Sequence, residues 1–204
     1  NISMEHIRQA VSSVLLERTR LTDDIDKKGR IAYHEAGHAL IGLLAHKRVG
    51  CLAIGKCGED GLGLGVCTFE ALEKPASFDE LENDILMSLA GKAACELQFG
   101  GTDIGTQNDL KTATEIIEHL LQQTAAYGWE YCYTKNEYAG NHSYALIDRT
   151  QEKVAELLGH YYTEAKKVIA ENKTLLDALA KALLEKEVLL YDDILQIATV
   201  FDLD

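Results

Sequence analysis

Apolar residues recur at helical spacing along most of this chain, so the sequence predicts a mainly helical protein. An amphipathic helix is expected over residues 3–16, followed by a polar linker. From Arg30 to about His46 the apolar residues surround most of the helical wheel, and a helix of this kind is buried. Further helices are expected from Thr106 to Tyr127, over an amphipathic stretch around 154–168, and after Thr174.

Capping pairs mark the starts of two central helices. Ser77 with Glu80 forms a capping box, and the apolar pattern behind it stops at the glycine pair Gly100–Gly101. Thr106 with Asp109 repeats the same spacing before the next helix. Both boundaries are therefore predicted from local chemistry as well as from periodicity.

Strand signals are confined to one region. Residues 49–68 are rich in glycine, cysteine and short apolar triplets, which predicts one or two short strands joined by a turn over 58–65. The expected fold class is mainly α, with a small β-ribbon beside the apolar helix. Residues 1–28 are expected to form an N-terminal helix and linker, and residues 29–204 one domain.

Composition narrows the function classes. The 204 residues include 20 Lys and Arg against 33 Asp and Glu, a formal charge of -13 that opposes binding to nucleic acid. No apolar run reaches the roughly 20 residues that cross a bilayer, and no secretory signal is visible. Five cysteines at irregular gaps favour reduced thiols. A cytoplasmic protein is expected.

The most specific motif is His34-Glu35-Ala36-Gly37-His38, inside the expected buried helix. Residues four apart lie about 40° from each other around a helix, so both imidazoles can reach one zinc ion. Two histidines and a glutamate would be costly to bury there without partners or metal. Glu35, next to the first histidine, is placed to take a proton from zinc-bound water. A catalytic zinc also needs a third protein ligand and an open position.

The third ligand is not settled by spacing. In the metzincin pattern HExxHxxGxxH the glycine and third histidine would fall on Ile41 and Leu44, so that pattern fails. His46 lies about 80° round the helix from His38 and points elsewhere. A thermolysin-like glutamate would fall near Glu59, which sits in a turn sequence.

Several blocks of the chain resemble the peptidase domain of the FtsH-type ATP-dependent zinc metalloproteases. The first block is Ile31 to Leu40, which contains the histidine motif, and the second is Leu89 to Ala94 with Glu96 and Phe99-Gly100. The third is Gly105 to Leu110 with Ala113-Thr114. Tyr127-Gly128 and Leu183 to Glu187 also match later parts of the family's sequence. The resemblance implies that Asp109 completes a site for one zinc ion. Glu96 is the next candidate, with an ion pair inside its helix as its alternative role.

The same resemblance carries expectations about the working protein. It implies an endopeptidase for unfolded or damaged polypeptides, with the β-ribbon holding the substrate chain as an added strand. Members of the family join this domain to an AAA ATPase module and work as hexamers, so such a module is expected in cis or in trans. ATP would act only through it. The helix over 3–16 resembles the end of the ATPase module, and a membrane tether outside this chain is compatible with a cytoplasmic location.

Two other functions and one rival motif have to be weighed. A catalytically degenerate module could keep the fold as a binding or assembly platform, and an enclosed pocket would instead suit a hydrolase of small amides. Residues 50–57 fit GxxxxGK, but Cys57 stands where a phosphate loop needs a hydroxyl. The chain is therefore not expected to bind nucleotide through this segment.

Overall fold

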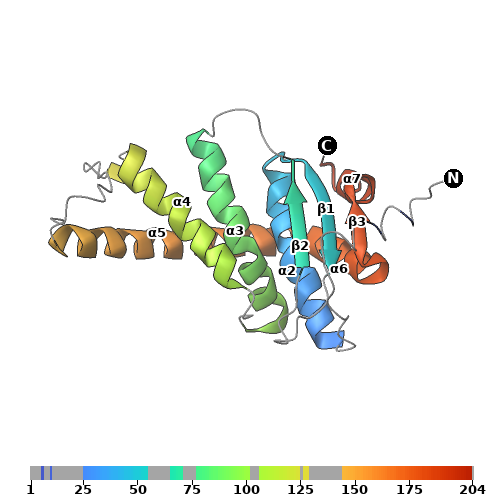
Figure 1. Cartoon of the computed structure of the whole chain (residues 1–204). Helices are drawn as coiled ribbons and strands as arrows, with labels where there is room; N and C mark the ends of the chain where they lie inside the picture. Colours follow the sequence, from blue (N-terminus) through green and yellow to red (C-terminus); the bar gives the residue numbers. More distant parts are fainter. Residues whose placement is uncertain are drawn as a thin grey trace.

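The computed structural model describes residues 6, 10, 25–54, 65–70, 77–101, 106–124, 126–128 and 144–203, and it is mainly helical. The elements are α2 (Ile25–Leu44), β1 (Val49–Ile54), β2 (Gly65–Phe69), α3 (Phe78–Phe99), α4 (Gln107–Thr124), η2 (Ala126–Gly128), α5 (Tyr144–Glu171), α6 (Lys173–Lys186), β3 (Val188–Leu190) and α7 (Tyr191–Thr199) (Figure 1). The expected helix over 3–16, apart from its two described residues, and most of the turn over 58–65 lie outside these ranges. Within them, no helix is both long and apolar enough to cross a membrane.

Helix α2 is the centre of the fold, as its apolar pattern predicts. It packs against α3, α6 and the strands β1 and β2, and Ala32, Ala36 and Leu40 have no exposed surface. The helix begins at Ile25 rather than Arg30. Asp26 in its first turn suits a helix N-terminus, and Lys28 pairs with Glu187 at the other end of the chain. The polar residues before Arg30 therefore belong to α2, because side chains such as Asp26 and Lys28 are stabilised outside the core.

The crossing of α2 and α3 depends on Gly37, inside the histidine motif. A β-carbon at this position would lie 2.6 Å from the carbonyl oxygen of Ala90 and 2.9 Å from the Ala94 methyl group. Only glycine therefore allows the two helices to approach this closely. Because the crossing lies between His34 and His38, both histidines are held in a fixed position relative to α3.

Both ends of α3 are capped as the sequence predicts. The Ser77 hydroxyl accepts a hydrogen bond from the Glu80 amide at 3.2 Å, and the Glu80 carboxylate accepts one from the Ser77 amide at 2.6 Å. The helix ends on Gly100 with φ 72°, a left-handed conformation that glycine adopts without strain. Helix α4 starts directly after Thr106.

The β-ribbon is confirmed, with one strand more than expected. Strands β1 and β2 pair antiparallel with Leu52 opposite Cys67, and β3 pairs antiparallel with the other edge of β1. The expected last helix is divided: α6 ends at Lys186 and is followed by Glu187 with φ 62°. Helix α7 follows β3, and there Asp193 accepts a hydrogen bond from the Leu190 amide at 3.1 Å. The strand β3 is only three residues long, too short for a period of two to be recognised.

Candidate metal centre

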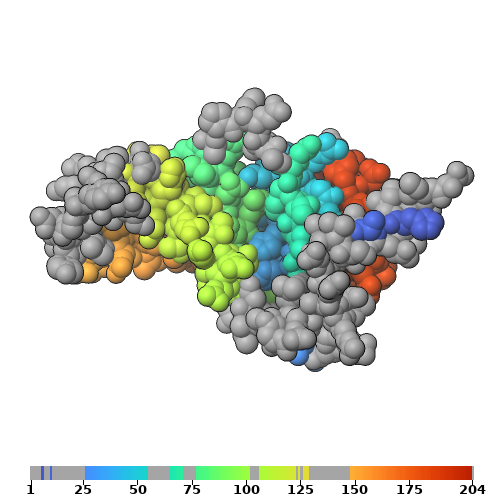
Figure 2. Space-filling view, viewed as in Figure 1, coloured from blue at the N-terminus to red at the C-terminus, as the bar shows by residue number. Residues whose placement is uncertain are grey.

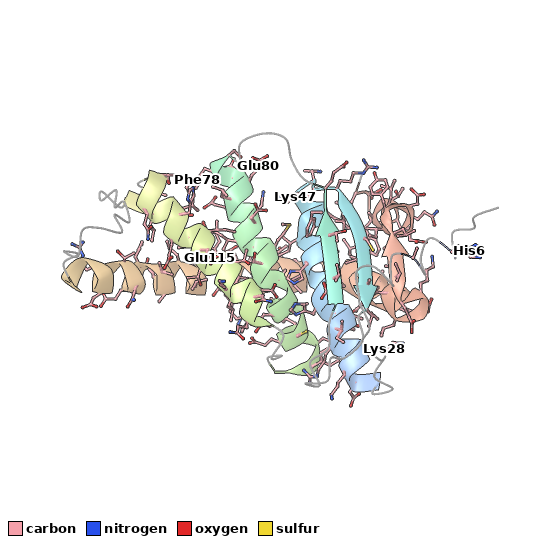
Figure 3. The ribbon with its side chains drawn as sticks, viewed as in Figure 1. His6, Lys28, Lys47, Phe78, Glu80 and Glu115 are labelled. Atoms are coloured by element: carbon pink, nitrogen blue, oxygen red, sulfur yellow. The ribbon has the colours of Figure 1, made fainter. Side chains whose placement is uncertain are left out.

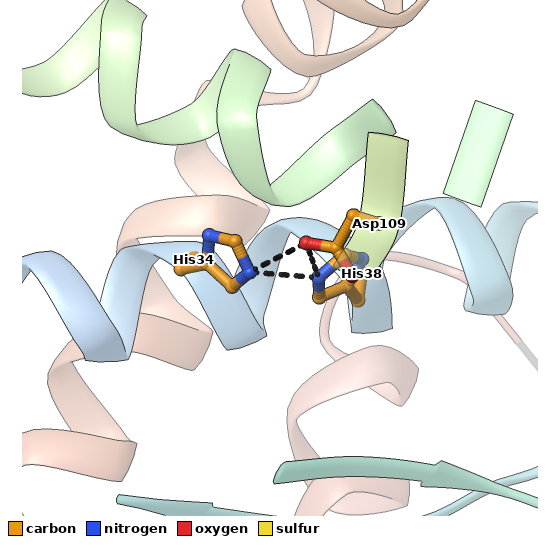
Figure 4. Close-up of side chains that lie close together, drawn as sticks. All are labelled: His34, His38 and Asp109. Atoms are coloured by element: carbon orange, nitrogen blue, oxygen red, sulfur yellow. Dashed lines mark hydrogen bonds and ion pairs between the residues drawn. The ribbon is translucent and has the colours of Figure 1, made fainter. Parts of the chain in front are cut away.

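Three side chains from two helices converge beside the crossing of α2 and α3. His34 and His38 project from α2, and Asp109 projects from the first turn of α4 (Figure 4). The Asp109 Oδ2 atom lies 3.0 Å from His34 Nε2 and 3.5 Å from His38 Nε2, while the two Nε2 atoms are 3.1 Å apart. Among the described residues this is the one group of His, Cys, Asp and Glu arranged to hold a metal ion.

Contacts with α3 fix both imidazoles. The His38 Nδ1 atom lies 2.7 Å from the Met87 carbonyl oxygen, and because a carbonyl can only accept, Nδ1 carries a proton and Nε2 is the nitrogen left to bind a metal. The His34 ring lies against Gly91, where an added β-carbon would come within 2.6 Å of the ring. Helix α3 therefore orients both rings toward the position that Asp109 faces.

The Asp109 carboxylate has an oxygen atom without a hydrogen-bond partner among the described residues. This atom, Oδ2, is buried. A buried polar atom without a partner is costly, so it indicates a missing ligand. Burial raises the pKa of the Asp109 carboxyl, but the two adjacent imidazoles outweigh burial and hold it well below its usual range. The group is thus an anion facing the Nε2 atoms of both imidazoles.

The spacing of the three atoms fits a zinc ion. Nitrogen and oxygen ligands at zinc-bond length in a tetrahedral arrangement lie about 3.3–3.5 Å from each other. The three observed separations of 3.0, 3.1 and 3.5 Å differ from this by a few tenths of an ångström. Two imidazoles and a carboxylate are also a donor set typical of catalytic zinc, and they leave one position open.

Glu35 lies beside the cluster and is almost completely buried, with 6% of its surface exposed. Burial raises the pKa of its carboxyl above the ordinary value, although the nearby His38 and His34 act in the opposite direction. Its side chain packs against the start of β2, where a β-carbon at Gly65 would lie 2.2 Å from Oε1. A glycine at this point of the strand is therefore what leaves room for the carboxylate.

The pKa of the His38 imidazole is raised by its charged neighbours. Burial acts to lower its pKa, but the adjacent Asp109 carboxylate and the charge of Glu35 outweigh this and raise the pKa to about 9. In the absence of metal, a proton would therefore occupy part of the space between the ligands. Metal binding at neutral pH is expected to displace it.

A cavity of about 580 Å³ opens over the cluster. Its walls come from α2, β2, α3 and α4, and in the space-filling view the blue surface of α2 is visible between α4 and β2 (Figure 2). It is lined by Ile31, His34, Glu35, His38, Gly65, Val66, Cys67, Phe69, Asp84, Met87, Ser88, Asn108, Asp109, Thr112 and Ile116. Because consecutive strand residues point to opposite faces, the run Gly65 to Cys67 indicates that the edge of β2 borders the cavity.

The other candidates from the sequence lie elsewhere. The Glu96 carboxylate accepts a hydrogen bond from Tyr162 and pairs with Lys92 at 3.4 Å and Lys166 at 3.6 Å, so it serves the contact of α3 with α5. His46 is exposed after the end of α2. Glu59 lies outside the described residues.

The GxxxxGK segment and the cysteines do not form sites in the described part of the chain. Gly50 belongs to β1, which is paired on both edges, and so cannot begin a phosphate loop. Among the described residues, Cys51, Cys67 and Cys95 form no disulfide. Burial raises the pKa of Cys51 to about 11, which makes it a weak nucleophile. Residues 57 and 132 lie outside the described ranges.

Gly91, Gly65 and the Met87 carbonyl contribute to the site without having been recognised as functional from the sequence. The role of the carbonyl cannot be read from the sequence, because every residue has a backbone carbonyl. The two glycines are visible, but their role depends on which side chain the fold places against them. The role of each glycine is therefore known only from the contacts in the folded structure.

Replacing Gly91 with alanine is expected to weaken zinc binding by about 10- to 100-fold, the range found when an outer partner of a ligand is lost. The new methyl group overlaps the His34 ring and must displace it. Zinc affinity measured by competition with a chelating dye tests this. Gly159→Ala in α5 is the matched control, since nothing lies within 4 Å of its added carbon. Equal affinities for both variants would contradict the role given to Gly91.

Comparisons with known proteins agree on one family. The model of "Peptidase family M41" matches residues 21–197. The chain is 31% identical to "ATP-dependent zinc metalloprotease FtsH 2" of Phytoplasma mali, covering 96% of this chain and 29% of that protein. It is 33% identical to the protein of that name from Thermoanaerobacter sp. (91% and 36%) and 28% identical to the FtsH of Thermotoga maritima (96% and 35%). The chain thus spans about a third of the length of these relatives, and it belongs to peptidase family M41.

Proposed function

We propose that this chain is a zinc-dependent endopeptidase that hydrolyses peptide bonds of unfolded or damaged polypeptides. The observation that carries the proposal is the buried, unpartnered Asp109 Oδ2 atom facing the Nε2 atoms of His34 and His38. In this proposal His34, His38 and Asp109 hold one zinc ion, and Glu35 is the catalytic base. The names of the relatives, which describe zinc metalloproteases, support the choice of metal and reaction.

Each residue has a defined task in the proposed reaction. When bound, the zinc ion lowers the pKa of a coordinated water and polarises the scissile carbonyl group. Glu35 takes the proton of the attacking water and delivers it to the nitrogen of the leaving amine. Because burial raises the pKa of Glu35, its carboxylate holds this proton more readily than an exposed glutamate would.

The strand beside the cavity supports a polypeptide as the substrate. Strand β2 forms one edge of the sheet in the order β2-β1-β3, so no described strand pairs with its outer backbone groups, and these suit pairing with an added strand. Gly65 contacts Glu35 and Phe69 contacts Gly42, which means that β2 runs alongside α2 past the metal ligands. A substrate chain paired with β2 would therefore pass over the site. Main-chain pairing would tolerate many sequences.

Function with an ATPase module is part of the same proposal. The relatives are named as ATP-dependent proteases and are about three times as long as this chain. An AAA ATPase module in cis or in trans would unfold and deliver the substrate, hexamers would be the working assembly, and a tether outside this chain could hold the protein at a membrane.

The test combines metal content with cleavage of an unfolded protein. The chain is expected to bind about one zinc ion by elemental analysis and to cleave unfolded casein, with activity lost on chelation and restored by zinc. A protein that binds no zinc under metal-replete conditions, or binds it and cleaves nothing, would instead favour a catalytically degenerate binding or assembly module.

A further inference from the structure

The cavity continues past His38 into a part that the chemistry of the zinc site does not use. Phe69 packs its ring over Gly42, one turn beyond His38 on α2, and Met87 on α3 accepts the His38 hydrogen bond. Ile116 on α4 lines the same cavity. All three residues line the same cavity as the metal ligands, and we call the part of it that they line the His38-side recess.

One charged side chain borders this recess. Asp84 lies one turn before Met87 and Ser88 on α3 and lines the cavity, with its side chain 31% exposed. The other charged groups among the described lining residues belong to the metal centre, namely Glu35, Asp109 and the two histidines. Asp84 is therefore the one charge in the described cavity wall that a substrate side chain can meet away from the zinc ion.

Asp84 is held in place from outside the cavity. Its carboxylate forms an ion pair with Lys47, which follows the end of α2 next to the top of α3 (Figure 3). Lys47 is 15% exposed, and it is absent from the described cavity lining. The pair thus fixes the Asp84 carboxylate while its cation lies behind the wall. Only the Oδ1 atom is engaged by Lys47, and a carboxylate has capacity for further donors.

We propose that the His38-side recess is a substrate subsite that takes a side chain with an apolar stem and a cationic end, that of lysine or arginine, and excludes acidic side chains. The walls formed by Phe69, Met87 and Ile116 contact the methylene groups, and Asp84 accepts hydrogen bonds from the charged end. An acidic side chain would bring a second negative charge beside Asp84 without a cation to meet it. This assignment rests on the proposed peptidase function and adds a charge preference to it.

The size of the preference follows from the partial exposure of Asp84. Ion pairs near the surface are weakened by water and salt, so the preference is expected to be about threefold to tenfold at low ionic strength. It is measured as the ratio of kcat/KM for a lysine-containing peptide to that for the matching glutamate-containing peptide. Added salt should reduce this ratio toward one.

The experiment uses peptides with a single cleavage site, in which leucine, lysine or glutamate is placed in turn at each position flanking the scissile bond. At one position the zinc-loaded wild type is expected to favour lysine over glutamate by the stated factor. Asp84→Asn should bring the ratio close to one. Lys47→Met should enlarge it, because Asp84 then lacks its internal cation. Glu115→Gln removes one charge from the exposed side of α4 and should keep the wild-type ratio.

The outcomes separate this inference from the proposed function. Cleavage of the leucine peptides with equal rates for lysine and glutamate at every position would overturn the subsite but leave the peptidase intact. An unchanged ratio in Asp84→Asn would do the same. Failure of the zinc-loaded wild type to cleave any peptide would overturn both. Each ratio compares two peptides cleaved by the same variant, so a loss of folded protein lowers both rates equally and cancels. The opposite effects expected for Asp84→Asn and Lys47→Met can therefore still be measured.

Discussion

Replacing Glu35 with glutamine is expected to lower kcat by about 10²- to 10⁴-fold, the contribution typical of general acid–base catalysis, while one zinc ion per chain remains bound. Glutamine has nearly the same shape and keeps the contact with Gly65, but its amide cannot take up the proton of the attacking water. The three proposed zinc ligands are untouched. The substitution also removes a buried carboxylate, so the folded protein should lose no stability.

Casein cleavage and zinc content are measured on the same preparation of Glu35→Gln. Glu115→Gln serves as the control, because it removes the same charge from an exposed position on α4 and should keep both properties of the wild type. Loss of zinc from Glu35→Gln would mean that Glu35 acts in binding the metal. Full activity with zinc bound would remove Glu35 from the mechanism.

The helical architecture was predictable because its determinants are local. The apolar pattern over 30–46 requires a buried helix, and that helix is α2 at the centre of the core. The pair Ser77 and Glu80 and the terminal Gly100 define α3 through contacts within a few residues of each other. The prediction of a mainly helical fold with a β-ribbon is confirmed, and it succeeded because it depended on these local patterns.

What could not be predicted depends on contacts between distant segments. The early start of α2 is accompanied by the pair of Lys28 with Glu187, which are 159 residues apart. Strand β3 is a strand only because β1 offers an unpaired edge. Periodicity contains no information on either contact.

The candidate site divides in the same way. His34, Glu35 and His38 lie within one helical turn, so their common direction follows from helix geometry. Asp109 is 71 residues beyond His38, and its spacing alone favours a helix cap; only the resemblance to a family marked it as a ligand. In the structure its Oδ2 atom lies beside both histidines, whereas Glu96 is engaged by Tyr162 and two lysines. The fold thus separates two carboxylates that the sequence leaves as alternatives.

Replacing Asp109 with alanine is expected to weaken zinc binding by more than the roughly 100-fold that loss of an outer partner costs, and to abolish cleavage with it. The substitution removes one of three protein ligands and the negative charge that faces the ion. The two imidazoles that remain cannot supply either. The carboxylate also faces both imidazoles, which hold its pKa low, so its removal is expected to cost the metal-free protein some stability at neutral pH.

This last effect gives the prediction a second, independent measurement. Thermal unfolding of the metal-free protein should be shifted somewhat downward in Asp109→Ala, whereas zinc should raise the melting temperature of the wild type and have little effect on the variant. Glu96→Ala is the control, since its carboxylate pairs with Lys92 and Lys166 on the α5 side of α3, and it should keep zinc and the stabilisation by zinc. If Asp109→Ala binds zinc as tightly as the wild type and is still stabilised by it, the third ligand is another residue and Asp109 only caps its helix.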